Sequence, residues 1–588
     1  MKNFFNLSSV LATALMMTVV SCSSSDDITG GNASGNAEGT TSYIAINLNS
    51  VGNAPTSRAD DQAKYDNGVA DENKIDKVRF YFFNADGTPY MLQKAGTNGQ
   101  SNWIEHQVNL KNNGNQNTNV SGTTSAVLVL NGESNVAPAT MLAVVNPDVN
   151  PKMLDNGTTA NLWSTMRTEM KGTKFNDATH GFMMSNSTYE DGGKDLCTTQ
   201  LTGRTFNSAN EAEDNPIEVF VERVNAKVKT DVDNNNFVKV TTDVMLDGVN
   251  FNGKYKTKAP VGKLATIQPD GSTKNTDVYA YLEDWGLGDE NGMAMLYKQI
   301  DVQNWTDATL GFSVTNPWSV AAYHRCFWGK GVAFGGTSTN SPLNHPYNEI
   351  KAEFGKALYT LPNTPTSYAG MYADPMKSYL TKIMVAARLA YVDDGGNVLP
   401  AEICTYKGQK FLGKDNVKKV IANELNAYFK KTGDTYTLIE ASDIDFSSKV
   451  TSTSGLMLQN YQVVADLRSG LTELYQKKGG SYVPVAVATV KAEMQRVPVD
   501  ICNGGRTYYY TPIKHLGKAY SIAEYGVVRN HSYQVEISSI KGFGTPVYNP
   551  SETIRPTLPS DDHTYLAAKI SVLSWRVVSS KVDLDKTK

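Results

Sequence analysis

The residue types that could form a catalytic or metal centre are few and scattered in this sequence. It contains seven histidines, and no two of them have the spacing of a metal-binding pair. Residues 231–235 begin like a calcium-binding loop, but Asn236 stands where such a loop needs glycine, and Thr242 stands where it needs a bidentate glutamate. We therefore predict a polar turn there and no metal site.

Nucleotide binding and nucleophilic catalysis also lack their sequence signatures. Gly329, Lys330 and Gly331 have neither the spacing nor the flanks of a phosphate-binding loop, and no nucleophile elbow is present. His324 and Cys326 are close in sequence, but Cys/His catalysis depends on two groups that face each other in space. We predict no cofactor and no enzymatic activity, because nothing brings together an acid, a base and an oxyanion site.

The first cysteine predicts chemistry of another kind. The apolar stretch of residues 10–20 is too short to span a bilayer, so residues 1–21 are predicted to be an export signal. Ser21 before Cys22 resembles a bacterial lipobox, in which the cysteine thiol is acylated, for example with palmitate. An ordinary signal peptide followed by an incidental cysteine is the alternative. Two or more acyl chains would hold the protein in the outer membrane.

The residues after Cys22 predict an exposed tether. Residues 23–27 read Ser-Ser-Ser-Asp-Asp and resemble the tract that directs lipoproteins of Bacteroidota to the cell surface. The run that follows, to Gly39, is rich in Gly, Asn and Ser, which is typical of a flexible linker.

The other four cysteines are Cys197, Cys326, Cys404 and Cys502. Export permits disulfides, but Cys404 and Cys502 each follow an isoleucine in what we expect to be buried strands, and free buried thiols are common. Their pairing stays open.

A strand and a protease-sensitive loop follow the tether. Ile44, Ile46 and Leu48 alternate with polar or small residues, which predicts a half-buried strand. The loop after it leads to Arg58 and Ala59, a bond that a trypsin-like protease could reach; a plain loop arginine is the alternative.

Length and composition predict a large globular protein. The chain has 588 residues, of which 40% are hydrophobic and 19% charged, with a net charge of -4. Such a chain forms more than one hydrophobic core, and without a basic surface it is not expected to bind nucleic acid.

The body of the chain reads as short strands separated by polar turns, which favours β-sandwiches. Strands are predicted at residues 77–83, 126–130, 141–145, 217–221, 485–490 and 534–537, and at 381–389, where a buried helix is the alternative. Helices are predicted at 162–170 and 416–431. The fold class is mainly β, with two tandem transthyretin-like β-sandwich domains, inserted loops and a few helices.

The predicted organisation has four parts. Residues 1–21 are the signal peptide, 22–58 a propeptide with the tether and a removable first strand, 59–215 an N-terminal sandwich domain, and 216–588 a C-terminal sandwich domain. Residues 265–345 are expected to be an insertion on the loops of the second domain.

The C-terminal residues form a long strand-like segment, about 570–588, without Pro or Gly. Either it pairs within its own domain, or it is an edge that another chain completes. Its apolar positions are Val572, Leu573, Trp575, Val577, Val578, Val582 and Leu584.

Taken in order, these features resemble the fimbrillins of Bacteroidota, the type V pilus subunits, and among them the stalk subunit of short (minor) fimbriae. The residues that carry the resemblance, besides Cys22 and the strand before Arg58, are the segments 65–68, 74–75, 80–83, 222–228, 324–328, 527–533 and 572–575.

The resemblance implies polymerisation by donor-strand exchange. An arginine-specific protease would cut after Arg58, residues 22–58 would leave with Ile44, Ile46 and Leu48, and the C-terminal strand of another copy would fill the groove. The implied partners are further copies bound head to tail, anchor and tip subunits, the protease, and a host or bacterial surface ligand. The fimbria would support adhesion or biofilm formation.

Two alternatives remain at this stage. One is an anchor or tip subunit of the same fimbria, although an anchor would lack the cut and a tip would need no donor tail. The other is a surface glycan-binding lipoprotein that stacks sugars on aromatic residues such as Tyr508, Tyr509 and Tyr510.

Overall fold

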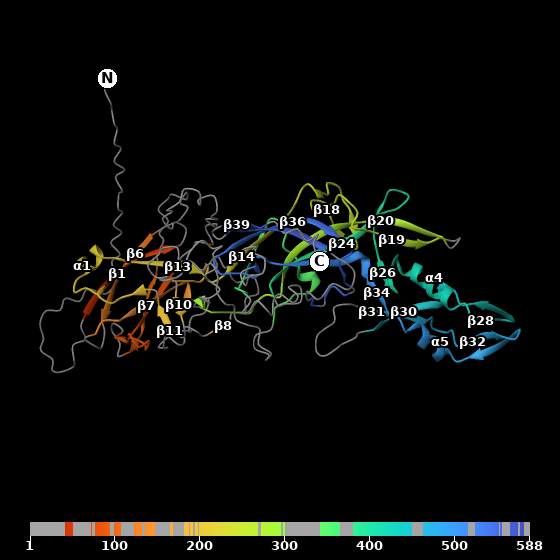
Figure 1. Ribbon diagram of the computed structural model, residues 1–588, viewed down its shortest axis with the longest axis horizontal. Coiled ribbons are helices and arrows are strands. Elements are labelled where there is room, and N and C mark those ends of the chain that lie inside the picture. Colours follow the sequence, from red (N-terminus) through yellow and green to blue (C-terminus); the bar gives the residue numbers. More distant parts are fainter. Residues whose placement is uncertain are drawn as a thin grey trace, which may run out of the picture.

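The computed structural model shows a mainly β protein, and the three largest hydrophobic cores of its described residues follow one another along its long axis (Figure 1). The structure describes residues 41–50, 72, 77–93, 99–107, 123–131, 136–147, 165–167, 181–186, 188–191, 194–197, 199–268, 272–295, 298–299, 342–364, 380–449, 462–515, 524–547, 549–551, 553–554, 565–573 and 577–580.

The first core belongs to sheet 1. Its strands, in spatial order, are β5 (Trp103–Gln107), β2 (Lys77–Phe83), β7 (Thr140–Val145), β9 (Met184–Asn186), β13 (Ile217–Arg223), β1 (Thr41–Ser50) and β6 (Thr123–Asn131), and β12 (Thr199–Gln200) pairs with β7. Strand β2 is buried on both faces, because Phe80 and Phe82 alternate with Tyr81 and Phe83 and all four are at most 3% exposed. This strand has the bounds predicted from its β-branched and aromatic sequence.

The second core lies between two sheets and forms a β-sandwich. Sheet 2 has the order β23 (Ala357–Thr360), β14 (Ala226–Val232), β36 (Ser532–Lys541), β38 (Tyr565–Leu573), β39 (Val577–Ser580). Sheet 3 has the order β30 (Ile444–Lys449), β31 (Gln462–Leu467), β34 (Val499–Cys502), β26 (Ile403–Tyr406), β27 (Gln409–Leu412), β19 (Gly262–Ile267), β20 (Thr273–Gly288), β24 (Lys382–Val392), β35 (Arg506–Pro512), β37 (Thr545–Pro546), with β15 (Phe237–Lys239), β18 (Tyr255–Thr257) and β25 (Val398–Pro400) beside it.

The two sheets meet through apolar side chains. Val228 and Tyr533 of sheet 2 share one cluster with Leu282, Trp285 and Val385 of sheet 3, and all are fully buried. The prediction of a mainly β, sandwich-type fold with few helices is therefore confirmed. The domain limits 59–215 and 216–588 stay a prediction.

A third core, which the sequence reading missed, is built from residues between Cys404 and Ile501. Helices α4 (Lys414–Glu424) and α5 (Val487–Met494) cover it, and β28 (Tyr428–Thr432), β29 (Thr435–Leu438), β32 (Leu474–Lys478) and β33 (Ser481–Val485) form a small sheet, the tip sheet, at the end of the molecule (Figure 1). Cys404 is fully buried in this core, as predicted, and its thiol, whose pairing the sequence left open, is free of any disulfide.

Several sequence predictions were wrong in this region. Residues 485–490 do not form one strand, because β33 ends at Val485 and α5 begins at Val487. Helix α4 ends at Glu424, and the last part of the predicted helix 416–431 is strand β28, whose hairpin partners outweigh local helix preference. Residues 273–288 form the long interior strand β20 and not an insertion on a loop.

Two further predictions have clear outcomes. Residues 165–167 form strand β8 (Thr165–Arg167), paired with β21 (Met293–Met295), where a helix was predicted. Residues 381–389 take the strand alternative as part of β24. The remaining short elements are α1 (Ala209–Asp214), β3 (Leu92–Gln93), β4 (Gln100–Ser101), β10 (Thr188–Asp191), β11 (Lys194–Cys197), β16 (Met245–Leu246), β17 (Val249–Asn250) and β22 (Lys298–Gln299).

Candidate functional site

Strand β1 is an interior strand of sheet 1. It runs antiparallel to β6, with partners from Thr41↔Asn131 to Asn49↔Thr123, and parallel to β13, with partners from Ile46↔Ile217 to Ser50↔Val221. In the order of described strands, β6 joins the sheet only through β1. Removal of β1 would therefore open a strand-wide gap and separate β6 from the rest of the sheet.

The side chains of β1 contribute to the first core. Ile44 and Ile46 are 0% and 1% exposed and belong to the same cluster as Leu128 of β6 and Val219 of β13. Leu48 lies opposite Val219 in the backbone register, and its side chain lies outside the described part. Each large apolar side chain that is fully buried contributes about 1.5–3 kcal/mol, so β1 stabilises the uncleaved chain substantially.

A second contact holds the start of β1. The backbone amide of Tyr43 donates to the carbonyl oxygen of Phe206 at 2.8 Å, and the amide of Phe206 donates back at 2.9 Å. Phe206 precedes helix α1, in which Ser208 caps the N-terminus by accepting a hydrogen bond from the amide of Glu211 at 3.3 Å. The Tyr43–Phe206 contacts would also be lost if β1 left.

Cys22, Arg58 and Ala59 lie outside the described residues, so the lipidation and cleavage predictions rest on the sequence. The first described residue after the predicted cut is Glu72, which is 1% exposed. Its carboxylate lies 2.7 Å from the ammonium group of Lys227 and accepts a hydrogen bond of 2.5 Å from the Tyr359 hydroxyl. Arg223 donates from Nε to the Glu72 carbonyl oxygen at 2.7 Å.

Two motifs noted in the sequence, residues 222–228 and 527–533, lie side by side. Strands β14 and β36 run parallel, with Lys227 opposite Ser532, and the amide of Lys227 donates to the His531 carbonyl at 2.9 Å. Arg223 and Lys227, which contact Glu72, belong to the first of these motifs. The sequence showed both motifs but could not show that they meet.

Arginine side chains extend this contact to sheet 1. Arg529 donates from Nη2 to the Ser185 hydroxyl on β9 at 2.9 Å and to the Glu222 carbonyl at 3.2 Å. Arg223 donates from Nη1 to the Asn530 side-chain oxygen at 3.3 Å. We call Glu72, Arg223, Lys227, Tyr359 and Arg529 the junction cluster. It holds sheet 1 and sheet 2 together without using β1.

The C-terminal segment is not one long strand in this structure. Strand β38 pairs antiparallel with β36 along its whole length, from Leu573↔Ser532 to Tyr565↔Lys541. Strand β39 then turns back and pairs with β38 only between Ile570↔Ser580 and Leu573↔Val577, so β39 is the edge of sheet 2. Of the predicted donor residues, Val572 and Leu573 lie in β38 and Val577 and Val578 in β39.

Trp575, Val582 and Leu584 lie outside the described residues, and the side chains of β38 and β39 are not described. The backbone alone indicates that β39 is held less strongly than β38, because fewer residues pair and one edge of the strand lies open among the described strands.

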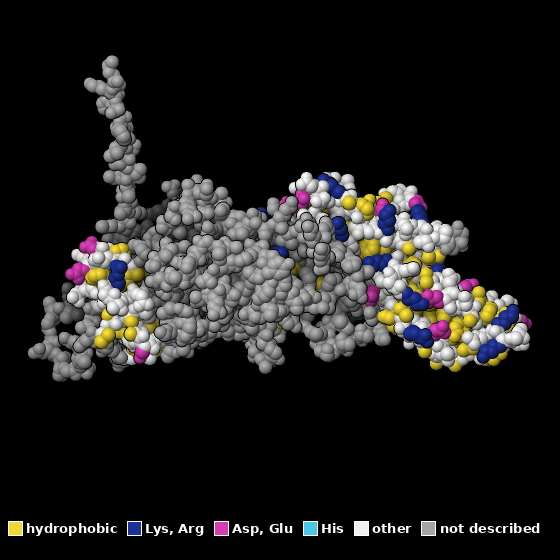
Figure 2. Space-filling model, in the orientation of Figure 1, with side chains coloured by type: hydrophobic (Ala, Val, Ile, Leu, Met, Phe, Trp, Pro, Cys, Tyr) yellow, Lys and Arg dark blue, Asp and Glu magenta, His cyan; other side chains and the backbone are white. Residues whose placement is uncertain are grey.

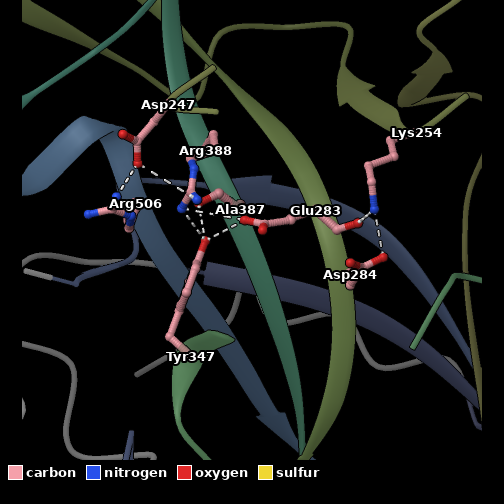
Figure 3. Close-up of polar contacts among 8 residues, drawn as sticks. All are labelled: Asp247, Lys254, Glu283, Asp284, Tyr347, Ala387, Arg388 and Arg506. Atoms are coloured by element: carbon pink, nitrogen blue, oxygen red, sulfur yellow. Dashed lines mark hydrogen bonds and ion pairs between the residues drawn. The ribbon is translucent and has the colours of Figure 1, made fainter. Parts of the chain in front are cut away.

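The clearest grouping of charged residues lies on sheet 3, and sequence reasoning missed it (Figure 3). Arg388 and Arg506 are direct cross-strand partners on β24 and β35, an arrangement that is unfavourable by itself. Asp247 forms ion pairs with both, and Glu283 lies 3.4 Å from Arg388. The Tyr347 hydroxyl accepts a hydrogen bond from Arg388 at 2.9 Å.

The neighbouring charges are also paired. Lys254 donates to Asp284 Oδ1 at 2.7 Å and to the Glu283 carbonyl at 2.6 Å (Figure 3). Burial raises the pKa of Asp284 above its usual value, and the hydrogen bond from Lys254 acts in the opposite direction. These groups neutralise one another and fix the strands; no spacing in the sequence could have revealed them, because they come from separate segments.

Other sites are not supported in the described part of the chain. There, no group of three or more His, Cys, Asp and Glu residues could hold a metal ion. Within the same residues, no helix is long and apolar enough to cross a membrane. The suggestion that Tyr508, Tyr509 and Tyr510 form a stacking surface was wrong, because they are 0%, 1% and 7% exposed. Strand β35 is covered on both faces, so each of them packs in a core.

Comparison with protein families gives one match. Residues 502–581 match the family described as "Major fimbrial subunit protein type IV, Fimbrillin, C-terminal". This region runs from the end of β34 through β36 and β38 to the end of β39. The resemblance to fimbrillins is therefore confirmed for this C-terminal region. The match supports a fimbrial subunit role at the cell surface. The expectation that the chain is not an enzyme agrees with a family of structural subunits.

Several solved structures share distant similarity. A putative cell adhesion protein of Parabacteroides distasonis is 9% identical, with 91% of this chain and 98% of that chain covered and a TM-score of 0.34. The tip fimbrial protein Mfa3 of Porphyromonas gingivalis, with a C-terminal truncation, is 10% identical, with 90% and 99% covered and a TM-score of 0.28. A fimbrial assembly protein of P. distasonis is 10% identical, with 74% and 99% covered and a TM-score of 0.23. At such scores no structural detail transfers from one chain to the other. No curated protein sequence matches the chain.

Proposed function

We propose that this chain, which carries a fimbrillin C-terminal region, is the stalk subunit of a cell-surface fimbria and polymerises by protease-triggered donor-strand exchange. The observation that carries the proposal is the position of β1: an interior strand with buried Ile44 and Ile46, located just before the predicted cleavage site at Arg58. The precursor is a lipoprotein, acylated at Cys22 and held in the outer membrane with its body outside the cell.

Cleavage after Arg58 releases residues 22–58, and mature chains begin at Ala59. The gap between β6 and β13 then lacks the hydrogen-bonding partners that β1 supplied on both sides. Each net hydrogen bond is worth about 0.5–1.5 kcal/mol, and unpaired strand edges attract another strand. The junction cluster keeps sheet 1 and sheet 2 together during this step, because none of its members lies in residues 22–58.

The incoming strand comes from the C-terminal segment of another copy. We assign the donated part to β39 and the residues after it, because β39 can leave sheet 2 while the longer β36–β38 pairing stays intact. Head-to-tail donation is a heterologous contact, so it extends into a filament and does not close a dimer. Accessory anchor and tip subunits would start and end such a filament.

Tyr508, Tyr509 and Tyr510 are buried, so they cannot stack on sugars as the glycan-binding lipoprotein alternative requires. An anchor or tip subunit remains the second candidate, and the state of the N-terminus distinguishes the roles. A stalk subunit must lose Cys22, whereas an anchor must keep it.

The test is N-terminal sequencing of fimbriae sheared from cells that express the wild-type chain, Arg58→Ala or Arg204→Ala. Arg204 is an exposed arginine at the end of a turn and serves as the matched control. We expect wild type and Arg204→Ala to give polymers that begin at Ala59, and Arg58→Ala to accumulate as an acylated precursor. Polymers that retain Cys22, or normal polymers of Arg58→Ala, would refute the proposal.

A further inference from the structure

The tip sheet presents a face of aromatic side chains that the polymerisation scheme does not use. Its opposite face packs on the third core through Tyr428, Leu474 and Val485. The outward face carries four half-buried aromatic residues of the paired strands, Phe429, Tyr436, Tyr475 and Tyr482.

The four rings contact one another and form one surface. Tyr436 and Tyr482 stack with ring centroids 4.0 Å apart and planes inclined by 5°, and Tyr475 meets Tyr436 edge to face at 5.0 Å. Phe429 meets Tyr482 edge to face, also at 5.0 Å. Beside Phe429, its cross-strand partner Leu438 is 44% exposed and extends the apolar area.

Two lysines border this aromatic face in equivalent positions. Lys431 is the cross-strand partner of Tyr436 and holds its ammonium group 5.8 Å from the ring centre. Lys477 is the cross-strand partner of Tyr482, at 5.9 Å. Both lysines are exposed, and no carboxylate of the described residues pairs with either of them. A cation over an aromatic ring is held there while it remains accessible to an anion.

The local charge is positive although the whole chain has a net charge of -4. The tip sheet and its turns contain Lys431, Lys477 and Lys478 against one acidic residue, Asp434, whereas Lys430 lies on the opposite face and pairs with Asp443 at 2.6 Å. Glu473, directly before β32, accepts a hydrogen bond from the Tyr475 hydroxyl at 3.0 Å. It forms no ion pair with Lys431 or Lys477 in the described part of the chain. Figure 2 shows hydrophobic side chains interspersed with Lys and Arg, and with some Asp and Glu, at this end of the molecule.

Tight turns keep the rings in place. Strands β32 and β33 are joined by Gly479 and Gly480 with φ of 57° and 89°, the left-handed values that a two-residue type I′ turn requires. Such turns fix the register, and with it the positions of Tyr475 and Tyr482.

We propose that the aromatic face of the tip sheet binds an acidic saccharide, a sugar chain that carries uronic or sialic acid. The C–H face of a sugar ring packs on the electron-rich face of an aromatic ring, and tyrosine hydroxyls bond to sugar hydroxyls. The sugar carboxylate pairs with Lys431 or Lys477 in a charge-assisted contact. An acidic peptide offers the carboxylate but no flat C–H face, so the four rings favour the saccharide.

The test uses the uncleaved full-length chain, so that its outcome does not depend on polymerisation. Isothermal titration calorimetry with 3′-sialyllactose and trigalacturonate should show saturable binding, with lactose and maltotriose as neutral controls. The double variant Lys431→Ala/Lys477→Ala should weaken binding about tenfold or more, whereas Lys478→Ala, which removes an exposed charge nearby, should not.

Further variants separate stacking from charge. Tyr482→Phe should retain most of the affinity, and Tyr482→Leu should lose it while circular dichroism shows a folded chain. No binding of either acidic sugar, equal binding of the neutral sugars, or preferential binding of a poly-glutamate peptide would overturn the proposal.

Discussion

Glu72 and Lys227 form a buried ion pair, with the carboxylate oxygen 2.7 Å from the ammonium nitrogen, between the segment after the predicted cleavage site and strand β14 of sheet 2. A charge buried in this way depends on its partner, because loss of one member leaves the other without compensation. The pair therefore holds the segment after the predicted cleavage site against sheet 2.

The junction pair should control stability in both precursor and mature chains. Glu72→Gln leaves the Lys227 ammonium group buried without its counter-charge, and we expect a loss of about 3–5 kcal/mol in the free energy of unfolding. The double variant Glu72→Gln/Lys227→Met should recover part of this loss. Chemical denaturation of wild type, the two single variants and the double variant checks the cycle, and purely additive effects would contradict a coupled pair.

Ile46 should stabilise the precursor only. Ile46→Ala creates a cavity in the first core and should cost about 2–5 kcal/mol in the uncleaved chain. Val129→Ala on the adjacent strand β6 changes a side chain that is 49% exposed, and should change stability by less than about 0.5 kcal/mol. After proteolytic maturation the Ile46 variant and wild type should unfold at the same denaturant concentration. A difference that persists would show that β1 has not left.

Truncation should separate the folding role of β38 from the donor role of β39. A chain that ends at Arg576 keeps the β36–β38 pairing and should fold and mature, but it should not form filaments in electron micrographs. A chain that ends at Thr564 also exposes the edge of β36 and should be less stable. Filaments from the chain that ends at Arg576 would exclude β39 and the following residues as the donor.

Asp443 should make the third core sensitive to acid. Burial by itself raises the pKa of its carboxyl, but hydrogen bonds from Lys430 and the Glu440 amide, together with the charge of Arg468, outweigh burial and lower the pKa below its usual value. A lowered folded-state pKa means that this stabilisation is complete above the unfolded pKa of about 3.9 and is lost as the pH falls through the folded value.

The comparison of Asp443→Asn with wild type isolates this contribution. As the pH falls below about 4, wild type should lose more stability than Asp443→Asn, because only wild type carries a carboxylate to protonate at this position. Asp434→Asn, a change at an exposed turn position, should follow wild type. Thermal unfolding followed by circular dichroism measures all three; parallel curves for Asp443→Asn and wild type would exclude the effect.

Where the alternation of apolar residues or an aromatic run is strong, the local sequence alone determined which segments become strands. The alternation of Ile44 and Ile46, and the aromatic run of β2, predicted their strands because side chains of a strand point alternately to its two faces. The resemblance to fimbrillins was also identifiable from the sequence, since each of the motifs that carry it is a short run of neighbouring residues. No structural information was needed for the proposed cleavage and lipidation sites, which depend on short motifs.

Only the tertiary structure decided which segments meet. Tyr508, Tyr509 and Tyr510 read equally well as a surface or a core, and they are buried because β35 is covered on both faces. Glu72 contacts Lys227 and Tyr359 on two different strands, and the aromatic face of the tip sheet arises from two separate hairpins. Periodicity is a property of neighbours in the chain, whereas strand partners and ion pairs are set by long-range packing, which a single sequence does not encode in any local pattern.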